Sequence, residues 1–207
     1  MGLTLDTWSH HNHLSAVLET AKAVPDCTFI LNHIGGPLRS RGGWEDVRDQ
    51  TDAEWREHIT ALAKLPNIVV KVGGAGMPSM GIPSVEDSWP RAEAPPSSQE
   101  MADAIFPFYE HVIREFGADR CKAAKAAALP AARCAVASGD CLALRGVCVA
   151  GMFESNFPVD KASFSFKVHW NACKRIAERL GLSAAEKDQI FAGTAERVYR
   201  LLPGSKL

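Results

Sequence analysis

The chain has 207 residues and a formal net charge of −1, with 23 Lys and Arg against 24 Asp and Glu. This length is enough for one domain with a sizeable core. The balanced charge argues against nucleic acid or a membrane surface as a partner, and no apolar run approaches the roughly 20 residues of a membrane span. The six cysteines show neither a disulfide framework nor a zinc spacing, which favours a reducing compartment.

Predicted strands and helices alternate along the chain. Apolar periodicity sets the bodies of the helices, while prolines at 25 and 66 end two of them. Ser97 and Glu100 have the spacing of a capping box. In chain order we expect a strand over 3–8, a helix over 14–24, a strand over 28–31, a helix over 52–65, a strand over 67–72, a proline-rich loop over 77–96, a helix over 97–116, a strand over 152–156, a helix over 164–180 and a helical pair from 183.

This order predicts βαβ units and a parallel sheet, in which each strand is covered on both faces. Each predicted strand ends in polar or glycine residues: His10-His11, Asn32-His33, Lys71 with Gly73-Gly74, and Glu154-Ser155-Asn156. Ligands bind at this edge of parallel α/β folds. A closed (β/α)8 barrel needs eight strands and roughly 250 residues. An open sheet of four strands could stand alone, but its long edges would need cover.

Residues 122–151 differ from the rest of the chain. The stretch is rich in alanine, carries Cys134, Cys141 and Cys148, and shows no steady period. It is either a flexible lid or partner-binding insert, or a translated non-coding insert such as a retained intron. The second interpretation is favoured, because deleting the stretch leaves a helix-to-strand connection of ordinary length.

Several segments together resemble the amidohydrolase-related family of TIM-barrel hydrolases, in the branch of 2-pyrone-4,6-dicarboxylate lactonase. They are LTLDTWSHHNHL, VPDCTFILNHIGGP, LPNIVVKVGGAGM, FGADRC joined to MFESNFPVDK, HWNACKRIAERL and IFAGTAERVYRL. The resemblance implies a partial (β/α)8 barrel containing about strands five to eight. It divides the chain into a barrel half at 1–121, an insert at 122–151, and a last strand with C-terminal helices at 152–207.

The resemblance also implies a metal-dependent hydrolase that opens a lactone or amide-type bond of a small carboxylated substrate by water attack. A divalent metal, Zn or Mn, is one expectation, with His33 as a ligand; catalysis without a metal is the other. A related carbon–carbon lyase, such as a decarboxylase, and a non-catalytic fragment are the alternatives. The family's first-strand His-x-His pair has no counterpart at its place, so we expect the chain alone to be impaired and to show no lactonase turnover.

Three residues are the catalytic candidates. The His33 ring should project from a strand end, where it could bind metal or stabilise an oxyanion, or be a satisfied core histidine. Asn156 stands where the family usually has Asp, and an amide can orient water but cannot accept its proton. Glu154 shares a side with Asn156 by strand alternation, so it is either a base or an ion-paired carboxylate.

Three further residues are candidates for substrate binding. Lys71 would pair with a substrate carboxylate or with a protein carboxylate. Trp8 would stack on a flat ring or belong to the core. His11 has the His-x-His spacing with His13, which in a strand would place both rings on one face; the alternative is a solvated loop end.

The chain ends in Ser205-Lys206-Leu207. This tripeptide is a peroxisomal address, so we expect a peroxisomal protein, with the cytoplasm as the alternative. Unpaired edges of a partial barrel would favour a homo-oligomer.

Overall fold

The computed structural model describes residues 4–40, 43–82, 95–117 and 151–201. The predicted insert at 122–151, except for its last residue, and the Ser205-Lys206-Leu207 terminus lie outside the described residues. No helix within these ranges is long and apolar enough to cross a membrane. The main elements are β1 (Thr4–Thr7), α1 (Leu14–Ala23), β2 (Thr28–Leu31), α2 (Arg48–Ala63), β3 (Ile68–Val72), α3 (Ser98–Phe116), β4 (Gly151–Phe153), α5 (Phe166–Arg179), α6 (Ala184–Asp188), the π-helical turn η8 (Gln189–Gly193) and α7 (Thr194–Tyr199).

The strands form one sheet in the order β1-β2-β3-β4, and all neighbouring pairs are parallel. This confirms the predicted α/β fold with a four-stranded parallel sheet. β1 and β4 are the edges among the described strands. All four carboxyl ends therefore lie at one edge of the sheet, as the sequence predicted.

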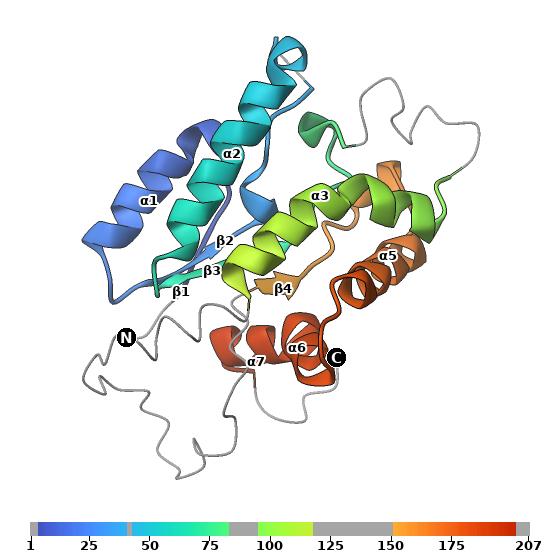
Figure 1. Ribbon diagram of the computed structural model, residues 1–207. Helices are drawn as coiled ribbons and strands as arrows, with labels where there is room; N and C mark the ends of the chain where they lie inside the picture. The colour runs from blue at the N-terminus through green and yellow to red at the C-terminus, as the bar shows by residue number, and fades with distance from the viewer. Residues whose placement is uncertain (1–3, 41–42, 83–94, 118–150, 202–207) are drawn as a thin grey trace.

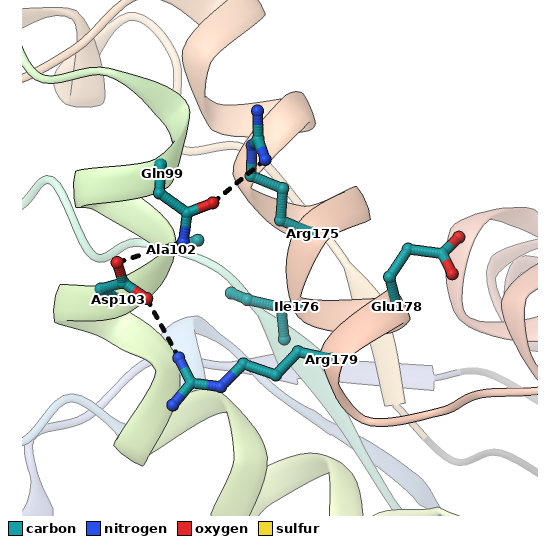
Figure 2. A pocket seen from close by; sticks show the side chains of 7 residues that line it. All are labelled: Gln99, Ala102, Asp103, Arg175, Ile176, Glu178 and Arg179. Atoms are coloured by element: carbon teal, nitrogen blue, oxygen red, sulfur yellow. Dashed lines mark hydrogen bonds and ion pairs between the residues drawn. The ribbon is translucent and has the colours of Figure 1, made fainter.

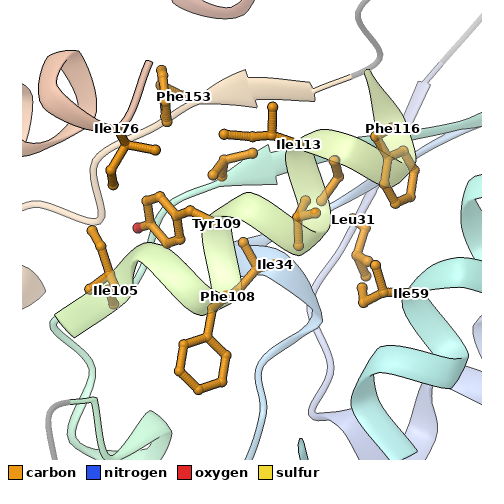
Figure 3. Packing of buried hydrophobic residues seen from close by; sticks show 14 of the residues in the cluster. Leu31, Ile34, Ile59, Ile105, Phe108, Tyr109, Ile113, Phe116, Phe153 and Ile176 are labelled. Carbon is orange, nitrogen blue, oxygen red and sulfur yellow. The ribbon is translucent and has the colours of Figure 1, made fainter. Parts of the chain in front are cut away.

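Helices α1, α2, α3 and α5 cover one face of the sheet (Figure 1). Every second strand residue, such as Leu31, Val70 and Phe153, points toward this face and packs against the helices. Tyr109 of α3 is fully buried near the centre of this core (Figure 3). Residues before and after the predicted insert thus share one sheet and one core.

The opposite face is covered by the C-terminal helices. Ile30, Val69 and Met152, which alternate with the residues of the first face, form a second cluster. Its partners are Ala195, Val198 and Tyr199, all from α7. We call this side of the sheet the α7 face.

The edge strand β1 departs from the expectation that every strand is covered on both faces. Leu5 is 49% exposed, although it alternates toward the helical face. α1 packs mainly against α2 rather than over β1. Nothing described covers the outer side of β1, so its apolar side chain remains in solvent.

Candidate active site

A left-handed turn presents His33 at the end of β2. His33 and Ile34 both have φ of +53°, and Gly35 and Gly36 continue with positive φ. Non-glycine residues in this region cost roughly 1–2 kcal/mol each and are common at functional sites. Trp55 of α2 donates from Nε1 to the Ile34 carbonyl at 2.7 Å, in a fully buried hydrogen bond. A hydrogen bond from the core therefore stabilises the turn that orients His33.

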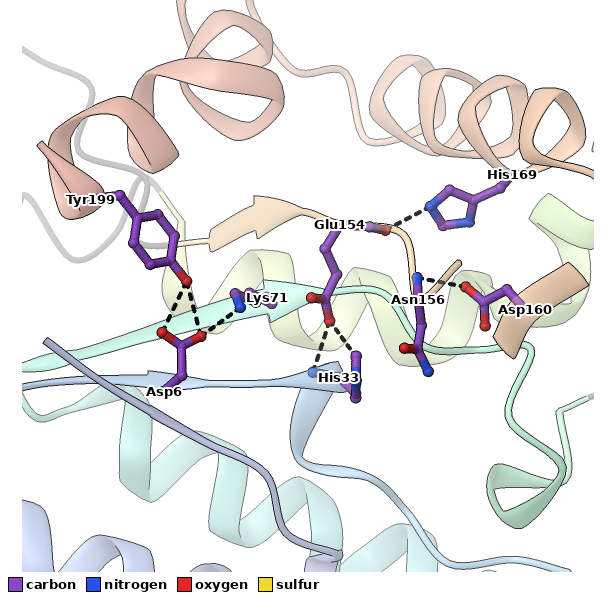
Figure 4. Close-up of polar contacts among 8 residues, drawn as sticks. All are labelled: Asp6, His33, Lys71, Glu154, Asn156, Asp160, His169 and Tyr199. Carbon is purple, nitrogen blue, oxygen red and sulfur yellow. Dashed lines mark hydrogen bonds and ion pairs between the residues drawn. The ribbon is translucent and has the colours of Figure 1, made fainter. Parts of the chain in front are cut away.

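One oxygen of the Glu154 carboxylate contacts two nitrogens of His33, one in the ring and one in the backbone (Figure 4). Glu154 Oε1 lies 2.5 Å from His33 Nδ1 and accepts the His33 backbone N–H at 3.0 Å. Both side chains are largely buried, at 17% and 15% exposure. Gly73 makes room for this pair, since a Cβ there would lie 2.3 Å from Glu154 Cγ. The contact joins the ends of β2 and β4, 121 residues apart.

A reciprocal turn follows Glu154. Asp160 accepts the Asn156 backbone N–H at 2.8 Å and returns its own N–H to the Asn156 carbonyl at 2.9 Å. The Asn156 side chain points to the same side as that of Glu154, as alternation predicted (Figure 4). Asp160 is fully buried, and this burial raises the pKa of its carboxyl despite the hydrogen bond from Asn156.

His169 of α5 also contacts this segment, a residue that the sequence reasoning missed. Its Nε2 lies 2.7 Å from the backbone carbonyl of Glu154, and its ring stacks on Phe164 at 5.8 Å. Burial lowers the pKa of His169, although the Glu154 carbonyl and the nearby Asp160 oppose that shift. A sequence signal existed, because His169 lies on the buried stripe of α5 with Ala172, Cys173 and Ile176.

Lys71 is paired within the protein. Its Nζ lies 2.5 Å from Asp6 Oδ1, and Tyr199 donates its hydroxyl to the same carboxylate at 2.9 Å. Burial alone would lower the pKa of Lys71, but the hydrogen bonds with Asp6 and Tyr199 raise it overall. Lys71 lies on the Glu154 side of this group (Figure 4). In this structure Lys71 is therefore ion-paired with a protein carboxylate, one of the two expected alternatives. To pair with Lys71, a substrate carboxylate would have to displace Asp6.

Trp8 lies beside the pair, whereas His11 does not. The Trp8 ring is 43% exposed and meets His33 edge-on at 4.9 Å. His11 is fully buried and accepts the Leu38 backbone N–H through Nδ1. His13 is exposed, so the two imidazoles do not share a face. His11 is therefore neither half of a metal pair nor a solvated loop end, and both expectations are wrong. The reason is that residues 11–13 form a 3-10 turn instead of a strand, and this turn packs His11 against α2.

The described side chains at this edge of the sheet do not make a metal centre by themselves. A zinc site generally needs three or four protein ligands. Within the described ranges, no three His, Cys, Asp or Glu side chains converge in a way that could hold an ion. His33 Nδ1 already faces Glu154. The residues described here do not fit a resident metal by themselves.

A separate groove of about 250 Å³ lies between α3 and α5 (Figure 2). Arg175 binds Gln99 there, and Arg179 is ion-paired with Asp103. The lining residues come from these two helices and from no strand end. The groove is therefore apart from the His33–Glu154 pair, and its arginines already have partners.

Solved structures resemble this fold. An amidohydrolase from Burkholderia multivorans with bound zinc superposes with a TM-score of 0.65 at 23% identity, over 96% of this chain and 53% of that one. The same amidohydrolase with bound HEPES gives a TM-score of 0.66. Amidohydrolase 2 from Bifidobacterium longum subsp. infantis gives 0.52 at 18% identity, over 97% of this chain and 51% of that one. At these identities the likeness concerns the fold.

Sequence comparison agrees with the fold. The protein y4mH of Sinorhizobium fredii is 28% identical over 200 residues, which are 97% of this chain and 48% of that protein. The chain thus spans about half the length of the relatives that it matches. The amidohydrolase family model matches residues 1–121, which is more than half of the chain and includes the His33 turn and β3. The chain belongs to the amidohydrolase family.

Proposed function

We propose that the chain carries the hydrolytic edge of an amidohydrolase-family hydrolase, with His33 and Glu154 as its acid–base unit. The observation that carries this proposal is the 2.5 Å contact between His33 Nδ1 and Glu154 Oε1 at the carboxyl edge of the sheet. A histidine whose Nδ1–H is held by a carboxylate keeps its lone pair on Nε2, the arrangement of a general base.

The reaction follows from that tautomer. His33 Nε2 takes a proton from water as the water oxygen attacks the carbonyl carbon of the substrate. Glu154 stabilises the imidazolium that forms. Collapse of the tetrahedral intermediate breaks the carbon–oxygen or carbon–nitrogen bond, and His33 returns the proton to the leaving atom. Asn156 supplies an uncharged amide that can hydrogen-bond the water or the substrate.

The substrate class that we propose is a small lactone bearing a carboxylate, as for the 2-pyrone-4,6-dicarboxylate lactonase branch. Trp8 supports this, since its exposed ring beside His33 offers a flat apolar surface. Lys71 supports it as a cation near Glu154, with Asp6 as the partner that a substrate carboxylate would displace. A divalent metal would have to draw ligands from beyond the described residues.

The test is hydrolysis by the purified chain of a panel of carboxylated lactones that includes 2-pyrone-4,6-dicarboxylate. The sequence alone predicted no lactonase turnover for this chain. The proposal instead requires slow turnover, because the His33–Glu154 pair forms within the chain. His33→Ala should lower the rate by about 10²- to 10⁴-fold. Glu154→Gln should lower it less, since an amide oxygen still accepts the Nδ1–H but carries no charge.

His13→Ala is the matched control, because His13 is an exposed histidine outside the pair. It should leave the rate unchanged. Ring-opened acid as the product supports hydrolysis, whereas release of carbon dioxide would identify the lyase alternative. A rate that does not depend on His33 for any compound in the panel contradicts the proposal.

A further inference from the structure

Two buried contacts fix the backbone on either side of the Glu154 side chain. Glu154 N–H donates to the Val72 carbonyl at 3.2 Å, which extends the β3–β4 ladder by one residue. On the other side, His169 Nε2 meets the Glu154 carbonyl at 2.7 Å. The ladder contact is ordinary sheet structure, but the second contact depends on one side chain, from α5.

The surroundings of His169 fix its ring. The residue is fully buried, its ring lies almost parallel to Phe164, with 9° between the planes, and Trp170 meets it edge-on. A backbone carbonyl only accepts hydrogen bonds, so Nε2 must be the protonated nitrogen of the neutral ring. The groups facing the ring are Asp160, Glu154 and Cys173. The burial that lowers the pKa of His169 favours this neutral donor over an imidazolium.

We propose that His169 is a positioning residue for the acid–base unit: its Nε2–H holds the Glu154 carbonyl, and through it sets the carboxylate against His33. The inference rests on the proposed function of the His33–Glu154 pair. His169 does not contact substrate. Without its donor, the Glu154 carbonyl loses this hydrogen bond, while the contact to Val72 and the Asp160–Asn156 turn remain. The peptide that carries Glu154 is then held on one side only, and its carboxylate moves away from Nδ1.

The experiment compares His169→Leu, which removes the donor, with His169→Gln, whose Nε2 amide can replace it. Ile176→Val, a buried change on the same stripe of α5, controls for loss of packing. The first readout needs no substrate. It is the downfield proton resonance of the His33 Nδ1–H···Glu154 hydrogen bond, assigned by its loss in His33→Ala.

We expect the resonance to disappear in His169→Leu and to persist in His169→Gln and Ile176→Val. In turnover, His169→Leu should lower kcat by roughly 10- to 100-fold with KM little changed, and His169→Gln should restore most of kcat. A resonance that persists in folded His169→Leu overturns the proposal, as does its loss in His169→Gln.

The turnover measurement and the proton resonance distinguish failure of the proposed function from failure of the role of His169. If wild-type chain shows no His33-dependent hydrolysis, the proposed function fails, while the resonance still decides the role of His169. If His169→Leu does not fold, as judged by circular dichroism, His169→Asn takes its place, because its shorter amide cannot reach the Glu154 carbonyl. Retention of the resonance in His169→Asn then overturns the proposal.

Discussion

At the scale of single residues, the site depends on groups that are not themselves reactive. The left-handed turn at His33 and Ile34 is unfavourable for both residues, and buried Trp55 compensates by satisfying the Ile34 carbonyl. Gly73 acts by the absence of a side chain beside Glu154. Substitution of Trp55 and substitution of Gly73 should therefore each have a measurable effect.

Trp55→Phe removes the Nε1 donor and leaves the Ile34 carbonyl buried without it. We expect the free energy of unfolding to fall by about 1–3 kcal/mol, the cost of an unsatisfied buried polar group, as measured by urea denaturation. Trp170→Phe on α5 is the control, since no hydrogen bond to a site turn is lost there. Equal losses in the two variants would show that ring size, rather than the hydrogen bond, accounts for the change.

Gly73→Ala places a Cβ 2.3 Å from Glu154 Cγ and 2.7 Å from the Glu154 carbonyl oxygen. Because a backbone atom is among the clashing atoms, Glu154 must shift, and we expect hydrolysis to fall by roughly 10- to 100-fold. In Gly193→Ala the new methyl group meets only the flexible Gln189 side chain, which can move away. Full activity in Gly73→Ala would argue against a fixed Glu154.

At the scale of elements, local patterns predicted most of the fold. The helix predicted over 97–116 is α3, including its Ser97–Glu100 capping box. The strands predicted over 28–31 and 67–72 are β2 and β3. α2 begins four residues earlier than predicted, at Arg48, because its first turn is polar and carries no apolar period. β4 ends at Phe153, so Glu154 to Asn156 lie in an irregular segment between the strand and the turn at 157–158, rather than in the strand predicted over 152–156.

The contacts of the site were less predictable than its residues. The strand-end pattern identified His33 and Glu154 as candidates but not that they bind each other. Lys71 pairs with Asp6, 65 residues earlier in the chain, and the Glu154 carbonyl accepts from His169, 15 residues later on another element. Such pairs depend on how helices pack on the sheet, which periodicity alone does not determine.

The half-buried His111 of α3 and the buried His169 of α5 make stability depend on pH. Burial lowers the pKa of His111 and of His169 below the ordinary value of 6.5. Their stabilisation is fully present above 6.5 and is lost as pH falls through the lowered values, because the unfolded chain then binds more protons. The urea midpoint should therefore stay nearly level above about pH 7 and fall as the pH is lowered below about 6.5.

The control for this pH dependence is His169→Gln, which should flatten part of the slope. Burial raises the pKa of Asp160 above 3.8, so this carboxyl acts in the opposite sense, favouring the fold as it becomes protonated. A urea midpoint that rises steadily as the pH falls across the window would show that carboxyl groups dominate instead.

At the scale of the whole molecule, the sheet has two open edges among the described residues. β1 and β4 are the edges of this sheet, and a closed barrel would pair such edges with further strands. The chain spans about half the length of its longer relatives. Leu5 and Trp8 add exposed apolar area at or beside the β1 edge. Unpaired edges of this kind favour association with another strand.

We therefore expect light scattering coupled to size-exclusion chromatography to give a mass above the 22.4 kDa of one chain. Leu5→Lys should shift the chain toward the monomer, because a lysine on an edge strand opposes strand pairing. Val24→Lys, at a position of similar exposure after α1, should leave the mass unchanged. A monomer at all concentrations would show that the β1 edge does not associate.

The Tyr199–Asp6 hydrogen bond has a consequence for biosynthesis. It joins residues 193 positions apart, and Lys71 binds the same Asp6 carboxylate. At about 5–20 residues per second, a ribosome makes Tyr199 some 10–40 s after Asp6. β1 must therefore wait for α7 to emerge before Asp6 gains its Tyr199 partner, and during that interval β1 is a natural target for a chaperone.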